Sequence, residues 1–369
     1  MDSMLADRLK HIDASGIRKV FDLAATMKDP INLSIGQPDF DVPDALKGLA
    51  MQAIDEGFNR YTMTQGIPEL RAGIMRQLRA AGRVPADDAL DVTITAGTSG
   101  GLLLALLTLV NPGDEVLFAD PYFVMYKHLV NLIGATPVFI DTYPDFTLTA
   151  ERVQRALTPR SKMLILNSPS NPTGVVLPPD VLRGIAGVCN AHGIWVLSDE
   201  IYSAFCYDAP FCSIFPMLER GLLLDGFSKS HAMTGWRVGY AVGPRAVIQE
   251  MNKVQQYTFV CAPSMAQKAA VAALDHDMQT QMAAYRRKRD MVYDSLRAHY
   301  ELSQPGGAFY AFVRAPGDNA TAFVQRAIAH NLLVIPGSVF SERDTHFRLA
   351  YTASDATIQR GIAVLRGLV

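Results

Sequence analysis

The chain has 369 residues, of which 49% are hydrophobic, so it can bury a large core and is expected to form two domains. Its formal net charge of −2 gives no attraction for nucleic acid or an anionic membrane. Residues Met1 to Asp13 contain no uninterrupted hydrophobic region, and the longest apolar run, around Leu102 to Val110, is too short to span a bilayer. We therefore expect a soluble, cytoplasmic protein without a nucleic-acid or membrane partner.

Cysteine and histidine spacing argues against two further classes of protein. The four cysteines show no C-x-x-C pair and are interpreted as reduced thiols, and the eight scattered histidines form no cluster of metal ligands. We predict no metal site. The basic quartet from Arg286 to Arg289 lies in a helical pattern, where a solvated face is expected.

Strand-like runs alternate with helical patterns through most of the chain. The predicted strands are Asp91 to Thr95, Glu115 to Ala119, Thr136 to Ile140, Lys162 to Asn167, Ile194 to Ser198, Leu222 to Phe227 and Val238 to Val242. The intervening helical stretches include Leu102 to Val110, Pro179 to His192 and Pro244 to Tyr257. This alternation predicts an α/β fold with a mostly parallel sheet and helices on both faces.

The pattern changes near Asp277. A long charged helix is expected to His299, followed by short strands at Phe309 to Val313 and Phe347 to Tyr351 and a closing helix from Ser354. We predict a large domain over residues 41–276 and a smaller α+β domain formed by residues 1–40 together with 277–369.

Polar residues follow several predicted strands at their carboxyl ends, where open α/β sheets bind their ligands. Gly97 to Gly101 follows the strand ending near Thr95, Asn171 follows the strand ending at Asn167, and Asp199 ends the next one. Ser228 and Lys229 follow the strand ending at Phe227. These groups are expected to meet at one edge of the sheet.

Lys229 is the central candidate because small and apolar residues surround it. Desolvation disfavours an ammonium ion, so its pKa should fall and its amine should become available as nucleophile and base for Schiff-base chemistry. The alternative places the lysine at an ordinary strand end with its charged head in water.

A phosphate site is the second candidate. The backbone N–H groups of Gly97 to Gly101 and the hydroxyls of Thr98 and Ser99 open a helix and could hold a phosphate, although Thr and Ser are also common helix caps. Arg237 would add a fixed cationic fork. Its alternative is a structural salt bridge.

Asp199 ends a run that reads as buried, where a carboxylate needs a cationic partner or several hydrogen-bond donors. A protonated heterocyclic nitrogen would satisfy it, as would backbone amides. Tyr202 could direct its phenol at the same ligand or could simply pack. A lysine, a phosphate cradle, an arginine and an aspartate together indicate a pyridoxal phosphate site.

A competing motif overlaps the cradle. Gly97 to Gly101 also matches G-x-S-x-G, the nucleophile elbow of serine hydrolases, with Ser99 as nucleophile and His330 or His346 as partner. No HGGG-type oxyanion segment precedes it, and this interpretation leaves Lys229, Asp199 and Arg237 without a role. It is the weaker hypothesis.

The chain resembles the fold-type I, class I/II aminotransferases of the aspartate/aromatic family, which depend on pyridoxal phosphate. The resemblance rests on blocks that occur in family order, namely Ser34 to Phe40, Tyr61 with Gly66 to Arg71, Asn167 to Gly174, Ser198 to Tyr202, Gly226 to Lys229, Met233 to Arg237, Gly306 to Tyr310 and Phe347 to Arg348. It implies a seven-stranded, mostly parallel sheet in the large domain.

The resemblance also implies residue roles. Lys229 would carry the cofactor as a Schiff base and then move the substrate's Cα proton, and Asp199 would pair with the ring nitrogen. The phenolic oxygen would contact Tyr202 and Asn171, and the ring would stack on Phe123. The phosphate would contact Thr98, Ser99, Ser228, Arg237 and Tyr61 of a neighbouring subunit, which implies a homodimer. The substrate carboxylate would contact Arg348, Asn171 and Gly36.

The expected reaction is ping-pong transfer of an amino group to 2-oxoglutarate from an aromatic or acidic amino acid. Arg18 or Arg60 could bind a distal carboxylate, whereas Ile17, Ile35, Met63 and Phe123 suggest an apolar pocket. C–S lysis, decarboxylation and synthase reactions on the same fold are the alternatives. The Asn171–Pro172 bond is expected to be cis.

Overall fold

The computed structural model describes residues 4–14 and 16–369, with only the backbone described for residues 18, 19 and 21. Its centre is a seven-stranded sheet of order β2-β8-β7-β6-β5-β3-β4. The strands are β2 (Leu90–Ala96), β3 (Glu115–Asp120), β4 (Thr136–Asp141), β5 (Ser161–Asn167), β6 (Trp195–Asp199), β7 (Gly221–Gly226) and β8 (Val238–Pro244). Strand β8 runs antiparallel to both neighbours and the other pairings are parallel, so the predicted mostly parallel sheet is confirmed.

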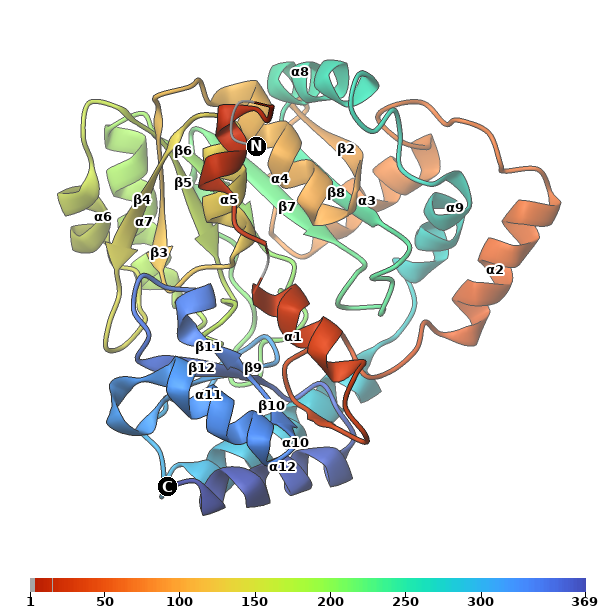
Figure 1. Cartoon of the computed structure of the whole chain (residues 1–369). Coiled ribbons are helices and arrows are strands. Elements are labelled where there is room, and N and C mark those ends of the chain that lie inside the picture. The colour runs from red at the N-terminus through yellow and green to blue at the C-terminus, as the bar shows by residue number, and fades with distance from the viewer. Residues whose placement is uncertain (1–3, 15) are drawn as a thin grey trace.

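Helices cover both faces of this sheet (Figure 1). In β3, Phe118 packs in a cluster with helices on one face, while the neighbouring Leu117 packs in a cluster on the other, because successive side chains in a strand point to opposite faces. The helices of this part are α2 (Asp44–Asp55), α3 (Pro68–Ala80), α4 (Gly97–Leu109), α5 (Met125–Leu132), α6 (Ala150–Ala156), α7 (Pro179–Ala191), α8 (Arg245–Gln256) and α9 (Ser264–Ala273). Within residues 4–14 and 16–369, no helix is both long and apolar enough to cross a membrane.

A smaller unit lies below the large sheet in Figure 1, drawn in blue. Its three-stranded antiparallel sheet has the order β11-β12-β9. Its elements are β9 (Tyr310–Arg314), β11 (Ile335–Pro336), β12 (His346–Ala350), α10 (Gln279–Leu296), α11 (Ala320–Ala329) and α12 (Asp355–Gly367).

The N-terminal segment joins this smaller unit. Strand β1 (Ile31–Asn32) pairs in parallel with β10 (Leu332–Leu333), and Leu33 is buried in the same core as β9 and β12. Helix α1 (Gly16–Ala24) lies between the blue elements and the large sheet in Figure 1. The exact domain boundaries at residues 40 and 276 stay a prediction.

The prediction that the whole Arg286 to Arg289 quartet faces solvent is wrong. Arg286 and Arg287 are exposed, but Lys288 is buried and forms an ion pair with Asp39. The side chain of Arg289 is 2% exposed and donates to both carboxylate oxygens of Asp208, at 2.8 and 2.9 Å. An exposed face was expected from charge alone, but only one side of helix α10 faces solvent.

Arg289→Ala should lower the free energy of unfolding by about 2 kcal/mol, because it removes a bidentate ion pair and the 2.6 Å bond to the carbonyl of Pro305. Chemical denaturation measures this change. Arg287→Ala is the matched control on the exposed side of the helix and should stay within about 0.5 kcal/mol of the unmodified protein. Equal effects of the two substitutions would contradict a structural role for Arg289.

Candidate active site

The carboxyl ends of the parallel strands converge on a cavity of about 290 Å³. Helix α4 begins directly after β2, Asp199 ends β6, and Lys229 follows β7, so three strands deliver side chains from the large sheet. Strand β12 adds Arg348 from the smaller sheet. The lining residues are Ile17, Gly36, Thr98, Ser99, Phe123, Tyr126, Asn167, Asn171, Asp199, Ile201, Tyr202, Ser228, Lys229, Thr234, Arg237, Tyr310 and Arg348.

The amine of Lys229 lies in this cavity and donates a 2.8 Å hydrogen bond to the carbonyl oxygen of Gly36. Burial lowers the pKa of Lys229 to about 8, and the positive charges of Arg348 and Arg237 act in the same direction. The alternative of a lysine with its head in bulk water does not hold. About a tenth of the amine is therefore uncharged at pH 7 and can act as nucleophile or base, far more than for an ordinary lysine.

Asp199 is buried at the end of β6. Its Oδ2 accepts a 2.6 Å hydrogen bond from the hydroxyl of Tyr126, and its Oδ1 accepts one from the backbone N–H of Ile201. Burial raises the pKa of Asp199 to about 6. A cation placed against this carboxylate would favour its charged form, so the site fits a protonated ring nitrogen.

The start of α4 has the features of an anion site. No side chain caps this helix, so the hydroxyls of Thr98 and Ser99 are not used as N-terminal caps. The guanidinium of Arg237 donates to the carbonyls of Thr234 at 2.9 Å and Ala96 at 3.3 Å, and within the described chain it forms no ion pair with a carboxylate. A Cβ on Gly97 would lie 2.4 Å from Nη2 of Arg237, and the positive φ of 67° at this position also favours glycine.

Arg348, on the smaller unit, also has the features of an anion site. It is buried, its Nη1 donates to Oδ1 of Asn171 at 3.0 Å, and its Nη2 donates to the carbonyl of Ser34 at 2.8 Å. Its Nε is buried without a hydrogen-bond partner. A buried guanidinium with an unsatisfied donor fits the carboxylate of a substrate.

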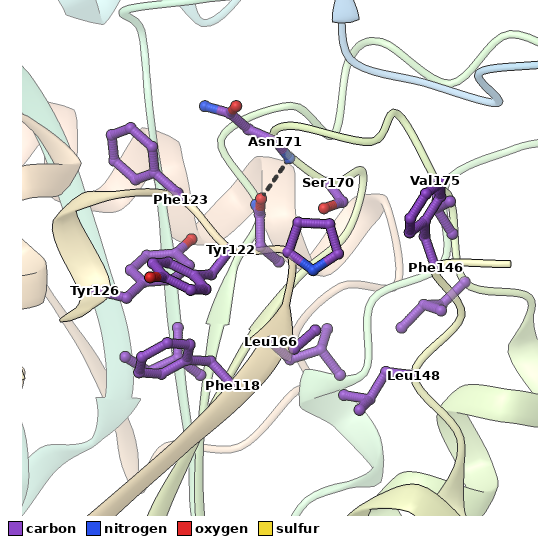
Figure 2. A pocket seen from close by; sticks show the side chains of 15 residues that line it. Phe118, Tyr122, Phe123, Tyr126, Phe146, Leu148, Leu166, Ser170, Asn171 and Val175 are labelled. Atoms are coloured by element: carbon purple, nitrogen blue, oxygen red, sulfur yellow. Dashed lines mark hydrogen bonds between the residues drawn. The ribbon is translucent and has the colours of Figure 1, made fainter. Parts of the chain in front are cut away.

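The loop after β5 is held by its own asparagines. The dashed line in Figure 2 marks the 2.8 Å bond from the backbone N–H of Asn171 to Oδ1 of Asn167. The Asn171–Pro172 bond is cis, which confirms that prediction. Phe123 also lines a smaller adjoining pocket, shown in Figure 2, whose volume of about 30 Å³ is too small for a substrate.

Five lining residues were given no role from the sequence, namely Tyr126, Asn167, Ile201, Thr234 and Tyr310. Asn167 ends a predicted strand and could have been found by the same argument as Asp199. Tyr126 bonds to Asp199 but lies in a helical pattern, where an aromatic residue usually indicates packing. Tyr310 belongs to the block that begins at Gly306, yet no role was assigned to it.

Several predicted residues lie elsewhere. Gly97 precedes the lining residues Thr98 and Ser99, while Tyr61 and Arg60 are exposed outside this chain's own cavity. Ile35 and Met63 do not line the cavity, and the side chain of Arg18 lies outside the described residues. His330 and His346 are not among the lining residues, so Ser99 lacks the histidine that the hydrolase interpretation needs.

Comparison with known proteins settles the family. The model of the aminotransferase class I and II family matches residues 28–365. The chain belongs to this family. It is 37% identical to a probable N-acetyl-LL-diaminopimelate aminotransferase of Bacillus subtilis, covering 98% of this chain and 95% of the relative. It is 35% identical to aromatic-amino-acid aminotransferase 2 of Thermococcus litoralis, covering 95% and 94%.

A solved structure agrees with this assignment. The aspartate aminotransferase of Thermus thermophilus with maleate superposes with a TM-score of 0.94 at 32% identity, covering 99% of each chain. Class I and II aminotransferases generally depend on pyridoxal phosphate. In the described residues of this aminotransferase, no group of three or more His, Cys, Asp and Glu side chains is arranged to hold a metal ion.

The lowered pKa of Lys229 can be tested by labelling of the cofactor-free aminotransferase with an aldehyde and borohydride. Only the uncharged amine reacts, and the pKa of Lys229 is about 8. The labelling rate at Lys229 should therefore rise about tenfold per pH unit up to pH 8 and level off at higher pH. Peptide mass spectrometry locates the label, and Lys229→Ala is the control. A rate that still climbs toward pH 10 would show an ordinary, solvated lysine.

Proposed function

We propose that this protein is a pyridoxal phosphate-dependent aminotransferase that moves the amino group of an L-amino acid to a 2-oxo acid by a ping-pong mechanism. The observation that carries the proposal is the presence of one lysine amine of lowered pKa and one buried arginine with an unsatisfied donor in the same cavity. An amine is needed for Schiff-base exchange, and an arginine is suited to a carboxylate.

The residues present fit the cofactor. Lys229 would bind its aldehyde, and Asp199 would keep its ring nitrogen protonated. Tyr202 and Asn171 would contact the phenolic oxygen, and Phe123 would lie against the ring. The phosphate would be held by Gly97, Thr98, Ser99, Ser228 and Arg237. When bound, pyridoxal phosphate supplies an electron sink for negative charge at the substrate's Cα.

Lys229 has two roles in this proposal. The incoming amino group would displace it from the cofactor's aldehyde carbon, and its free amine would then move the proton from Cα of the substrate to that same carbon. A pKa of about 8 suits this exchange, because the amine can both accept and release a proton near neutral pH. The bond to the Gly36 carbonyl marks where the amine rests.

Arg348 supports the ping-pong order. An amino acid and an oxo acid both carry an α-carboxylate, and Arg348 has the single buried guanidinium donor without a partner among the described residues that line this cavity of about 290 Å³. The two substrates would therefore bind in turn at the same arginine. The first product must leave before the second substrate enters.

The lining suggests the substrate class. Ile17, Ile201, Phe123 and Tyr310 give the cavity apolar and aromatic walls, while Arg237 and Arg348 give it positive charge. Among the relatives, one is named for aromatic amino acids and another is an aspartate enzyme with the dicarboxylate maleate. We propose 2-oxoglutarate as acceptor and an aromatic or acidic amino acid as donor, in a cytoplasmic enzyme.

We also propose a homodimer with shared sites. Tyr61 is 83% exposed and does not line the cavity of its own chain, so its proposed phosphate contact requires a second copy. Met63, Tyr257, Phe259 and Val260 are exposed apolar side chains that add to such a surface. The loop that carries Tyr61 and Met63 lies beside the segment from Tyr257 to Val260, as the hydrogen bond from the side chain of Gln255 to the carbonyl of Thr64 indicates.

A panel of L-amino acids assayed with 2-oxoglutarate tests the reaction. Glutamate should form with aromatic or acidic donors in the protein loaded with pyridoxal phosphate, and Lys229→Ala should abolish this turnover because the amine exchanges the Schiff base and moves the proton. Release of ammonia, carbon dioxide or sulfide is measured in parallel. If these products form without glutamate, the protein performs one of the alternative reactions of the fold.

Arg348→Gln should raise KM for every amino acid donor about 100-fold, because a bidentate charge-assisted contact to the α-carboxylate contributes about 3 kcal/mol. Steady-state kinetics over the donor panel measures this change. Arg343→Gln, at an exposed arginine that pairs with Asp141, is the control and should leave KM unchanged. A normal KM in Arg348→Gln would exclude Arg348 as the carboxylate ligand.

A further inference from the structure

Tyr310 joins the two halves of the site. It is buried on β9 and lines the cavity, and its hydroxyl lies 2.9 Å from the hydroxyl of Tyr202. Its ring lies 4.5 Å from the guanidinium carbon of Arg348. One side chain thus contacts a residue proposed to bind the cofactor and another proposed to bind the substrate.

The backbone at Gly36 fixes the position of this hydroxyl. A Cβ on Gly36 would lie 2.3 Å from the Tyr310 hydroxyl oxygen, so the backbone approaches the phenol more closely than any side chain would permit. The carbonyl of the same Gly36 accepts the hydrogen bond from Lys229. The hydroxyl of Tyr310 is therefore confined on one side by the backbone at Gly36 and on another by Tyr202.

Either hydroxyl of this pair could donate, and the charge near the two phenols decides which one does. Burial raises the pKa of both Tyr310 and Tyr202, so both keep their protons at neutral pH. Arg348 opposes this effect at both phenols, but its guanidinium carbon lies 4.5 Å from the centre of the Tyr310 ring, so it polarises the O–H of Tyr310 more strongly and makes it the better donor. Tyr202 has one hydrogen, and it can give that hydrogen to an anionic oxygen only if it accepts from Tyr310.

We propose that Tyr310 is a positioning residue for the transamination site. Its hydroxyl donates to Tyr202, which leaves the hydrogen of Tyr202 for the phenolic oxygen of the cofactor, and its ring holds the guanidinium of Arg348 in the orientation that receives the substrate carboxylate. This inference rests on the proposed function. The hydroxyl of Tyr310 thus acts on the cofactor through Tyr202, and its ring acts on the substrate through Arg348.

Tyr310→Phe tests the hydroxyl, since it removes one oxygen and keeps the ring. Without the donor, Tyr202 withdraws less charge from the phenolic oxygen, so the Schiff base holds its proton more tightly. The pH titration of the bound cofactor's visible absorbance should shift upward by about half to one unit. KM for the amino acid should stay within about twofold of the unmodified enzyme.

Tyr351→Phe is the matched control. This tyrosine is also buried and follows the neighbouring strand β12, its hydroxyl bonds to the carbonyl of Ala308 at 3.3 Å, and it does not line the cavity. It should titrate like the unmodified protein. An equal shift in both variants would mean that loss of any buried phenol disturbs the site, and it would overturn the proposal.

Tyr310→Leu tests the ring. Loss of the contact with Arg348 should raise KM for the amino acid about three- to tenfold beyond its value in Tyr310→Phe. An unchanged titration in Tyr310→Phe, or an unchanged KM in Tyr310→Leu, would overturn the corresponding half of the proposal. Absence of transamination in the unmodified protein would instead overturn the proposed function, and the absorbance titration separates these outcomes because it needs no turnover.

Discussion

The described residues that line the cavity include three cationic side chains and one buried carboxylate. The chemistry of the site depends on this excess of positive charge. Arg348 and Arg237 lie close enough to Lys229 to lower its pKa, in addition to the larger effect of burial. The excess positive charge prepares the cavity for anions. A phosphate at Arg237 and a carboxylate at Arg348 would supply the negative charge that balances these cationic side chains.

The sheet holds this arrangement with a buried ionic cluster outside the cavity. Arg83 forms ion pairs with Glu200 at 2.6 Å and Asp225 at 2.7 Å. Glu200 follows Asp199 directly, and Asp225 lies in the strand that leads to Lys229. The cluster therefore ties together the two neighbouring strand ends that carry the acid and the amine. Removing one member would leave unpaired charge in the interior, where it is costly.

The substrate side of the cavity comes from distant parts of the chain. Gly36 belongs to the N-terminal segment and Arg348 to a strand near the C-terminus, and both are held by the core of the smaller unit around β1, β9 and β12. Asn171 from the large sheet accepts a hydrogen bond from Arg348. The proposed carboxylate site thus forms where the two units meet, whereas the proposed anion site at α4 is built by the large sheet alone.

The sequence by itself determined the type of fold and most of the residues at the sheet edge, because strand periodicity and the polar residues after each strand are local signals. Lys229, Asp199 and Asn171 could be placed together by this argument without any structure. Arg348 could not, since an arginine in a strand is more often structural, and its assignment came from family resemblance. Only the tertiary structure showed that its Nε lacks a partner, that Tyr126 bonds to Asp199, that Tyr310 bridges Tyr202 and Arg348, and that Arg289 is buried. Burial and partner choice depend on contacts between residues far apart in the chain, and these are not encoded in any single segment.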